Sequence, residues 1–139
     1  MEAIPPPDPG DTEAIAWSFW ALLGQGRVEE AVTLLDDDGV YWANTYDARE
    51  ERPMPTMKNF FRQAITAVPM TFTKHDALVA GDRVALEIES FAETTRGTYN
   101  NRYCFIMTIN AGKITRVHEY VDTRHASDVL IPAIRDAMQ

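Results

Sequence analysis

Hydrophobic residues follow two different periods along the chain, and the period changes near residue 70. Before that point they recur every three to four positions, which is typical of amphipathic helices. After it they alternate with polar residues, which is typical of strands that have two different faces. Helices followed by a run of strands indicate an α+β fold, in which the helices cover one face of an antiparallel sheet.

Helix-capping residues and helix breakers set the limits of the predicted helices. Helical segments are predicted at residues 12–23, 27–35, 56–68 and 127–138, the last one interrupted near Pro132. A short strand is predicted at residues 40–43. The polar stretch 44–55 contains prolines, and we expect it to form a loop at the mouth of a site.

Four strands are predicted in the second half of the chain, at residues 72–79, 84–93, 99–109 and 114–122. Their connections are short enough for an antiparallel meander. A tight turn at Asn110-Ala111-Gly112-Lys113 is predicted between the last two strands, because Gly supplies the positive φ that a hairpin needs. Asn101 and Glu119 lie inside these two mostly apolar strands. The sheet face that carries them is therefore either half solvated or lines a cavity that needs polar atoms.

Side-chain alternation divides the strand residues into two sets, one for each face of the sheet. The first set comprises Ala85, Glu87, Glu89, Phe91, Tyr99, Asn101, Tyr103, Phe105, Met107, Val117, Glu119 and Val121. The second set comprises Leu86, Ile88, Arg102, Cys104, Ile106, Arg116, His118 and Tyr120. Neither set is purely polar, so we expect both faces to be covered, one by the helices and the other by a second copy of the chain.

Charge balance and cysteine content narrow the classes of function. The 21 acidic and 13 basic residues give a net charge of −8, which argues against a nucleic-acid partner. The single cysteine excludes an internal disulfide, and no apolar run approaches the ~20 residues of a membrane span, so we expect a cytoplasmic protein with no membrane partner. The three histidines lack zinc-ligand spacing and no glycine-rich phosphate motif occurs, so we expect neither a metal nor a cofactor.

Residues 1–10 are predicted to be an irregular, proline-rich arm, and residues 11–139 one domain.

Three motifs add a resemblance to a known family. They are G-D-R-V-A at residues 81–85, Y-N-N-R-Y at 99–103 and G-K-I-T-R-V-H-E-Y-V-D-T at 112–123. With the order helix-helix-strand-helix-meander, the sequence resembles the SnoaL-like branch of the nuclear transport factor 2-like superfamily. The resemblance implies a cone-shaped half-barrel, whose curved sheet wraps helices around a deep apolar pocket, and a homodimer formed through the outer face of the sheet.

The resemblance also implies which set of strand residues faces the pocket. It places the first set, with Asn101, Tyr103 and Glu119, on the pocket wall. The residues left for the dimer contact are then Leu86, Ile88 and Ile106. From the pattern alone, the opposite orientation of the strand at residues 84–93 stays open, with Leu86 and Ile88 inside.

Three carboxylates are the candidate acid and base groups. In an epoxide hydrolase of this superfamily, an Arg and an Asp on one strand and an Asp on the last strand match Glu87, Glu89 and Glu119 here. The arginine is missing, so the epoxide reaction does not transfer. Three carboxylates in one apolar pocket cannot all ionise at neutral pH, and one of them is expected to keep a proton. We expect Glu119 to act as the base and Glu87 or Glu89 as the proton donor.

The remaining candidates are hydrogen-bond donors and apolar wall residues. Tyr41 or Tyr103 is expected to donate to a developing oxyanion, and Asn101 to orient substrate or water. The expected ligand-binding wall comprises Trp17, Phe60, Phe91, Phe105, Met107, Val117 and Val121.

Two alternatives compete with this assignment. The glutamates at 87 and 89 can instead point to solvent and pair with Arg83, Arg96 or Arg102, and the tyrosines can be ordinary core residues. The sequence thus favours a cofactor-free isomerase, cyclase, dehydratase or hydrolase that acts on a small hydrophobic or aromatic molecule. The competing hypothesis is a non-catalytic ligand-binding or assembly module of the same fold.

Overall fold

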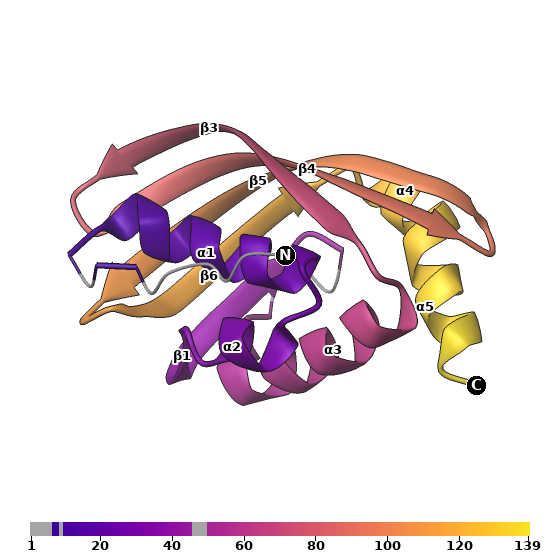
Figure 1. Cartoon of the computed structure of the whole chain (residues 1–139), viewed down its shortest axis with the longest axis horizontal. Coiled ribbons are helices and arrows are strands. Elements are labelled where there is room, and N and C mark those ends of the chain that lie inside the picture. The colour runs from indigo at the N-terminus through magenta and orange to yellow at the C-terminus, as the bar shows by residue number, and fades with distance from the viewer. Residues whose placement is uncertain (1–6, 9, 46–49) are drawn as a thin grey trace.

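The computed structural model describes residues 7–8, 10–45 and 50–139. The arm predicted at residues 1–10 therefore lies largely outside the described residues. In the rest, a curved sheet is packed against helices on its concave side (Figure 1). The predicted α+β half-barrel is confirmed.

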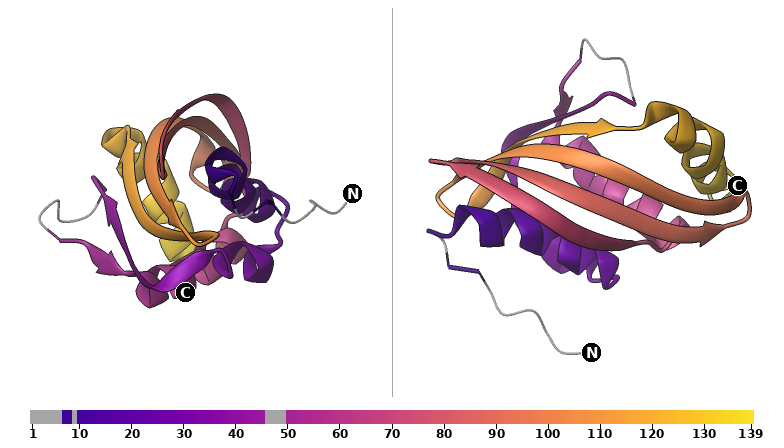
Figure 2. Two further views of the ribbon diagram at one scale, coloured as in Figure 1. Left: turned by 90° about the vertical axis from the view of Figure 1, so that its left-hand side faces the viewer. Right: turned by 90° about the horizontal axis from the view of Figure 1, so that it is seen from above.

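Six strands form one open sheet in the order β2-β1-β6-β5-β4-β3. Their bounds are β1 (Leu35–Ala43), β2 (Arg52–Pro53), β3 (Thr71–Ala80), β4 (Arg83–Thr94), β5 (Gly97–Asn110) and β6 (Lys113–Val121). Strands β3 to β6 make the predicted antiparallel meander, while β1 pairs with β6 in parallel. Figure 2 shows the sheet curling around α1, which lies inside the curl.

The helices are α1 (Thr12–Gly24), α2 (Val28–Val32), α3 (Met54–Ala67), α4 (Thr123–His125), the π-helical turn η1 (Ala126–Leu130) and α5 (Ile131–Ala137). Helix α1 begins as predicted, because the Asp11 side chain accepts a hydrogen bond from the backbone N–H of Ala14. The predicted limits of the second helix were wrong. It ends at Val32, and the acidic run after it belongs to β1. No helix among the described residues is both long and apolar enough to cross a membrane.

Aromatic side chains join α1 to α3 and to the sheet. Trp20 stacks on Phe105 of β5 with ring centroids 3.9 Å apart, and Phe61 of α3 meets Phe19 edge to face. All four side chains are buried. Fully burying such a side chain stabilises the fold by about 1.5–3 kcal/mol, so these contacts fix α1 and α3 against the concave face.

The β5–β6 hairpin has the predicted turn and the predicted faces. Ala111 and Gly112 both have positive φ, as a two-residue hairpin turn of this kind requires. Phe105 lies opposite Glu119, and Tyr103 lies opposite Val121. All four residues therefore share the concave face, together with the buried Asn101.

The predicted orientation of β4 was wrong. A two-residue turn, Thr95-Arg96, joins β4 to β5, so that Ile88 lies opposite Tyr103 and Glu87 opposite Cys104. Leu86 and Ile88 are consequently fully buried on the concave side, not in an outer contact. The alternate residues of β4, including Glu87 and Glu89, face outward.

Candidate functional site

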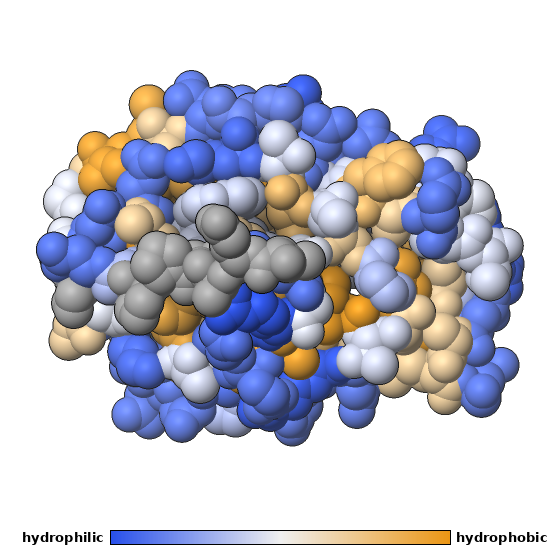
Figure 3. Space-filling model, viewed as in Figure 1, coloured by the Kyte–Doolittle hydropathy of each residue, from blue (hydrophilic) through white to orange (hydrophobic). Residues whose placement is uncertain are grey.

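A cavity of about 90 Å³ opens between the sheet, α1, α3 and the C-terminal helical segment. It is lined by Trp20, Leu23, Thr45, Met57, Phe60, Phe61, Ala64, Ile65, Val68, Met70, Phe72, Tyr99, Tyr103, Phe105, Glu119, Val121, Ala126, Leu130, Ile131 and Ile134. Figure 3 shows hydrophobic side chains gathered in the region that β3, α3 and α5 bound in Figure 1. The space is large enough for several water molecules or one small organic molecule.

The lining is apolar apart from Thr45, Tyr99, Tyr103 and Glu119. Cavities of this composition bind molecules that are mainly hydrophobic and that carry a few polar atoms at fixed positions. Among the residues that line this cavity, Glu119 is the one carboxylate. The arrangement therefore offers one ionisable acid and two phenol groups to a ligand.

Only part of the expected apolar wall lines the cavity. Phe60, Phe105 and Val121 line the cavity. The four others do not: Met107 and Val117 are buried in the core, Trp17 is half-buried under the Lys74 ammonium, and Phe91 is 47 % exposed on the outer face. Phe91 lies outward for the same reason as Glu87 and Glu89, since it belongs to the same alternate set on β4.

Glu119 combines contact with the cavity and a close hydrogen bond. Its carboxylate accepts from the Tyr41 hydroxyl at 2.5 Å, and Tyr41 itself is 1 % exposed. The Glu119 residue keeps some accessible surface where it lines the cavity, yet its carboxyl group is surrounded by protein. Burial raises the pKa of Glu119 to about 7, and the Tyr41 hydrogen bond works in the opposite direction. A carboxyl group of this kind can both accept and release a proton near neutral pH.

A second group of polar side chains lies beside Glu119 and is called the tyrosine relay below. It comprises Asn101, Tyr99, Tyr103 and Ser90. Asn101 Nδ2 donates to Tyr99 Oη at 2.9 Å, the two tyrosine Oη atoms lie 2.8 Å apart, and Tyr103 Oη lies 3.0 Å from Ser90 Oγ. Burial raises the pKa of both tyrosines, so both phenols stay protonated and act as donors at neutral pH.

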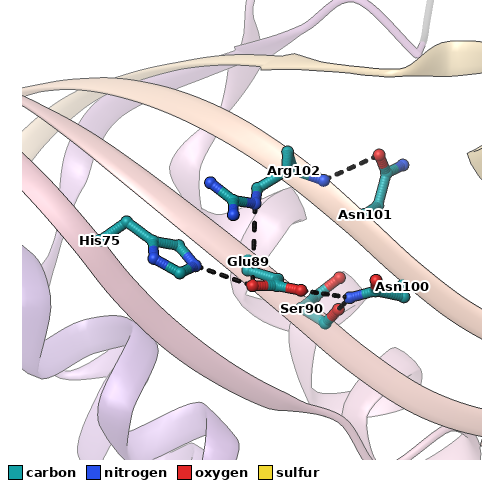
Figure 4. Close-up of polar contacts among 6 residues, drawn as sticks. All are labelled: His75, Glu89, Ser90, Asn100, Asn101 and Arg102. Atoms are coloured by element: carbon teal, nitrogen blue, oxygen red, sulfur yellow. Dashed lines mark hydrogen bonds and ion pairs between the residues drawn. The ribbon is translucent and has the colours of Figure 1, made fainter.

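Glu87 and Glu89 do not enter the cavity, so the predicted cluster of three carboxylates is wrong. Figure 4 shows Glu89 on the outer face, between His75 of β3 and two residues of β5, Asn100 and Arg102. Its carboxylate lies 2.7 Å from His75 Nε2, 2.8 Å from Asn100 Nδ2 and 3.7 Å from Arg102 Nε. The hydrogen bonds from Asn100 and His75 lower the pKa of Glu89. Glu89 is thus an ion-pair residue on the outer face, as the competing hypothesis for the two glutamates expected.

Sequence reasoning missed two members of the site. Tyr99 belongs to the set expected on the pocket wall but has no predicted role, and Ser90 belongs to neither of the two sets of strand residues. Ser90 is fully buried on the concave side because it lies opposite Asn101 in the β4–β5 ladder. Ser90 is a polar residue at an alternate position of β4, in line with the apolar Leu86 and Ile88. This contrast was the available signal in the sequence. No three His, Cys, Asp or Glu side chains of the described residues gather closely enough to hold a metal ion.

The SnoaL-like domain family matches residues 17–117, which is most of the chain. The chain belongs to the SnoaL-like domain family. Among curated proteins, no sequence matches this one. The match includes the part of α1 from residue 17, the first five strands and both tyrosines of the relay, but it stops two residues before Glu119.

Solved structures show that this SnoaL-like domain has the nuclear transport factor 2-like fold. PrhC of Penicillium brasilianum NBRC 6234 is 15 % identical with a TM-score of 0.78, over 94 % of this chain and 93 % of that one. The LEH-like epoxide hydrolase of M. tuberculosis is 16 % identical with a TM-score of 0.73, over 91 % and 94 %. A candidate SnoaL-like polyketide cyclase of Shewanella putrefaciens CN-32 is 13 % identical with a TM-score of 0.71, over 87 % and 86 %.

Proposed function

We propose that this SnoaL-like protein is an enzyme that moves a proton on a small hydrophobic molecule, with Glu119 as the group that accepts and returns it. The observation that carries the proposal is a single carboxyl group with a pKa of about 7 in an apolar cavity. A base works best when its pKa lies near the working pH, because it is then largely ionised and still basic enough to take a proton.

The tyrosine hydroxyls complete the chemistry. Tyr103 lies opposite Val121, so it is a diagonal neighbour of Glu119 on the same sheet face. Diagonal neighbours in an antiparallel pair lie about 7–8 Å apart, which leaves room for one reacting group between them. Removal of a proton next to a carbonyl builds negative charge on the carbonyl oxygen, and a phenol donor stabilises that charge.

One carboxyl group is sufficient for two kinds of reaction. In an isomerisation, Glu119 takes a proton from one carbon and returns it to another carbon of the same molecule. In an aldol-type cyclisation, the enolate attacks a second carbonyl and the proton goes to the new alkoxide. Both reactions are balanced without another acid, whereas the acid and base pair first expected from Glu87, Glu89 and Glu119 is not assembled. Cyclase chemistry is also what the Shewanella relative is named for.

The first experiment uses 2-tetralone, a small hydrophobic ketone with acidic C–H bonds, in deuterium oxide. We expect the wild-type protein to accelerate exchange of its α-protons, followed as loss of the proton NMR signal. The exchange rate is expected to rise with pH and to level off above about 7, as Glu119 ionises. Glu119→Gln should slow the catalysed exchange by about 10²–10⁴-fold, which is typical for loss of a general base.

Glu87→Gln is the matched control, since it makes the same change at an exposed position on the outer face of β4, outside the cavity. It should leave the exchange rate unchanged. Catalysed exchange that survives Glu119→Gln would refute the assignment of the base. Binding of 2-tetralone without any acceleration would favour the non-catalytic ligand-binding module.

A further inference from the structure

The tyrosine relay has a direction, and the backbone around Asn101 sets it. Asn101 Oδ1 accepts from the backbone N–H of Arg102 at 2.9 Å, while Nδ2 donates to the backbone carbonyl of Asp122 at 3.1 Å. A backbone N–H can only donate and a carbonyl can only accept. These two partners therefore allow one orientation of the Asn101 amide, and in that orientation Nδ2 donates to Tyr99.

The relay holds one hydroxyl proton more than it can bond internally. Tyr99, Tyr103 and Ser90 carry three hydroxyl protons between them. Two links join their oxygens, Tyr99 to Tyr103 and Tyr103 to Ser90, and each link uses one proton. Asn101 meets Tyr99 with a donor and so accepts none of them. One proton is left without an acceptor among the described residues.

The cavity is the place where that proton can be accepted. Ser90 is fully buried and does not line the cavity, whereas both tyrosines do. Tyr99 has 0 % of its surface exposed and Tyr103 has 9 %, so Tyr103 has the better access to a bound molecule. With Tyr99 and Ser90 both donating to Tyr103 Oη, the Tyr103 proton is free to point into the cavity.

We propose that the tyrosine relay makes Tyr103 a hydrogen-bond donor to the bound molecule, with Asn101 acting through Tyr99 as its positioning residue. The inference rests on the proposed function, because it concerns the same cavity, and it adds the chemistry of the ligand. The bound molecule carries an acceptor oxygen, such as that of a ketone, where it meets Tyr103. A hydrocarbon of the same shape leaves the surplus proton unpaired and binds less tightly.

A matched pair of probe molecules tests this. 4-Fluoroacetophenone and 4-fluoro-α-methylstyrene have the same shape, but the second has a CH₂ group in place of the carbonyl oxygen. We expect the wild-type protein to bind the ketone up to about tenfold more tightly in fluorine NMR titrations, which is the range for one net hydrogen bond. The infrared carbonyl band of the bound ketone should shift to lower frequency relative to the ketone in an alkane.

Asn101→Asp reverses the relay. Arg102 still donates to one carboxyl oxygen. The other oxygen faces the Asp122 carbonyl, so it carries a proton that it donates to that carbonyl, and it now accepts from Tyr99. Tyr99 then accepts from Tyr103, and Tyr103 accepts from Ser90, so all three hydroxyl protons are bonded and none is left for a ligand. The variant should bind both probes equally, and the carbonyl band should move back to higher frequency. A merely structural role of Asn101 would not move this band selectively.

Ser90→Ala keeps one hydroxyl proton that has no acceptor within the relay. Tyr99 and Tyr103 then carry two hydroxyl protons, and the single hydrogen bond between them uses one. This variant should keep the preference for the ketone, and it tests the proton count even if Asn101→Asp does not fold. Equal binding of both probes to the wild-type protein would overturn the relay and leave proton transfer by Glu119 standing. A preference that survives in Asn101→Asp, or is lost in Ser90→Ala, would also overturn it. If neither probe binds the wild-type protein, both the inference and the proposed function are wrong.

Discussion

The Tyr41 hydroxyl donates a hydrogen bond to the Glu119 carboxylate, with 2.5 Å between Oη and Oε1, although the two residues are 78 positions apart. They meet because β1 runs parallel to β6, with Ala43 beside Glu119 and Tyr41 two residues earlier on the same face. The bond holds one oxygen of the carboxylate, so the other oxygen is left to meet a ligand. Tyr41 thus both orients the proposed base and limits the rise of its pKa.

Protein stability should depend on pH through Glu119. Below pH 4.5 the carboxyl is protonated in both the folded and the unfolded state, whereas between 4.5 and about 7 the folded state alone keeps the proton. A raised folded-state pKa therefore favours folding at low pH, and this contribution is lost as pH rises through about 7. The loss should be about 3 kcal/mol, at about 1.4 kcal/mol per pH unit.

Other groups also titrate, so the difference from Glu119→Gln isolates this one. Urea unfolding of both proteins at pH 5 and pH 8 gives the comparison. The wild-type protein should lose stability relative to Glu119→Gln between the two pH values. A difference that does not change with pH would show that Glu119 ionises normally in the folded protein.

Filling the cavity should abolish ligand binding. Ala64 of α3 lines the cavity, and Ala64→Phe adds a ring where the ligand would lie. We expect binding of 4-fluoroacetophenone to fall below detection in fluorine NMR titrations. Ala67→Phe adds the same ring one helical turn later, outside the cavity lining, and should leave binding intact. Unchanged binding in Ala64→Phe would place the ligand elsewhere.

Neighbouring residues of β4 should respond in opposite ways to truncation. Leu86 is fully buried, so Leu86→Ala should destabilise the protein by about 2–5 kcal/mol through lost burial and a new cavity. Glu87 is exposed, so Glu87→Ala should leave the free energy of unfolding nearly unchanged. Denaturant unfolding measures both. The reverse result would restore the orientation of β4 that the family resemblance implied.

We propose that the outer face of the sheet forms a homodimer, although not through Leu86 and Ile88. That face carries the half-buried Ile106, with Phe91 47 % exposed and Tyr120 42 % exposed. In sedimentation experiments the wild-type protein should be a dimer and Ile106→Arg a monomer, because an arginine there would be buried unpaired. Gln63→Arg, on the exposed side of α3, should stay dimeric. A monomeric wild-type protein would refute the proposal.

A register shift between Thr108 and Ile109 brings Glu119 opposite Phe105, whereas the two-residue turn with unbroken alternation would bring His118 there. The sequence was sufficient for the meander and for that turn, and the family resemblance implied the faces of β5 and β6. It was not sufficient for β4, where each alternate set contains apolar residues. A three-residue loop would pair Thr94 with Thr98 and bring Glu89 beside Tyr103, whereas the observed two-residue turn pairs Thr94 with Gly97. A register shift of one residue moves every side chain of a strand to the other face.

The acidic run at residues 36–38 shows a second limit. Three successive aspartates predict the end of a helix and a loop, yet they lie in β1, whose register with β6 is irregular between Leu35 and Val40. Leu35 and Val40, on either side of this run, pair with the distant strand β6, and this pairing overrides local preference. The same long-range pairing brings Tyr41 to Glu119. The spacing of residues along the sequence does not predict this contact.

The ionisation of Glu119 tests the central claim most directly. Carbon-13 NMR of the glutamate side-chain carboxyls, assigned by comparison with Glu119→Gln, gives its pKa in the folded protein. We predict a value near 7 in the wild-type protein and a higher value in Tyr41→Phe, which lacks the hydrogen bond that lowers it. A value near the ordinary 4.5 in the wild-type protein would contradict the assignment of Glu119 as the proton-transfer group.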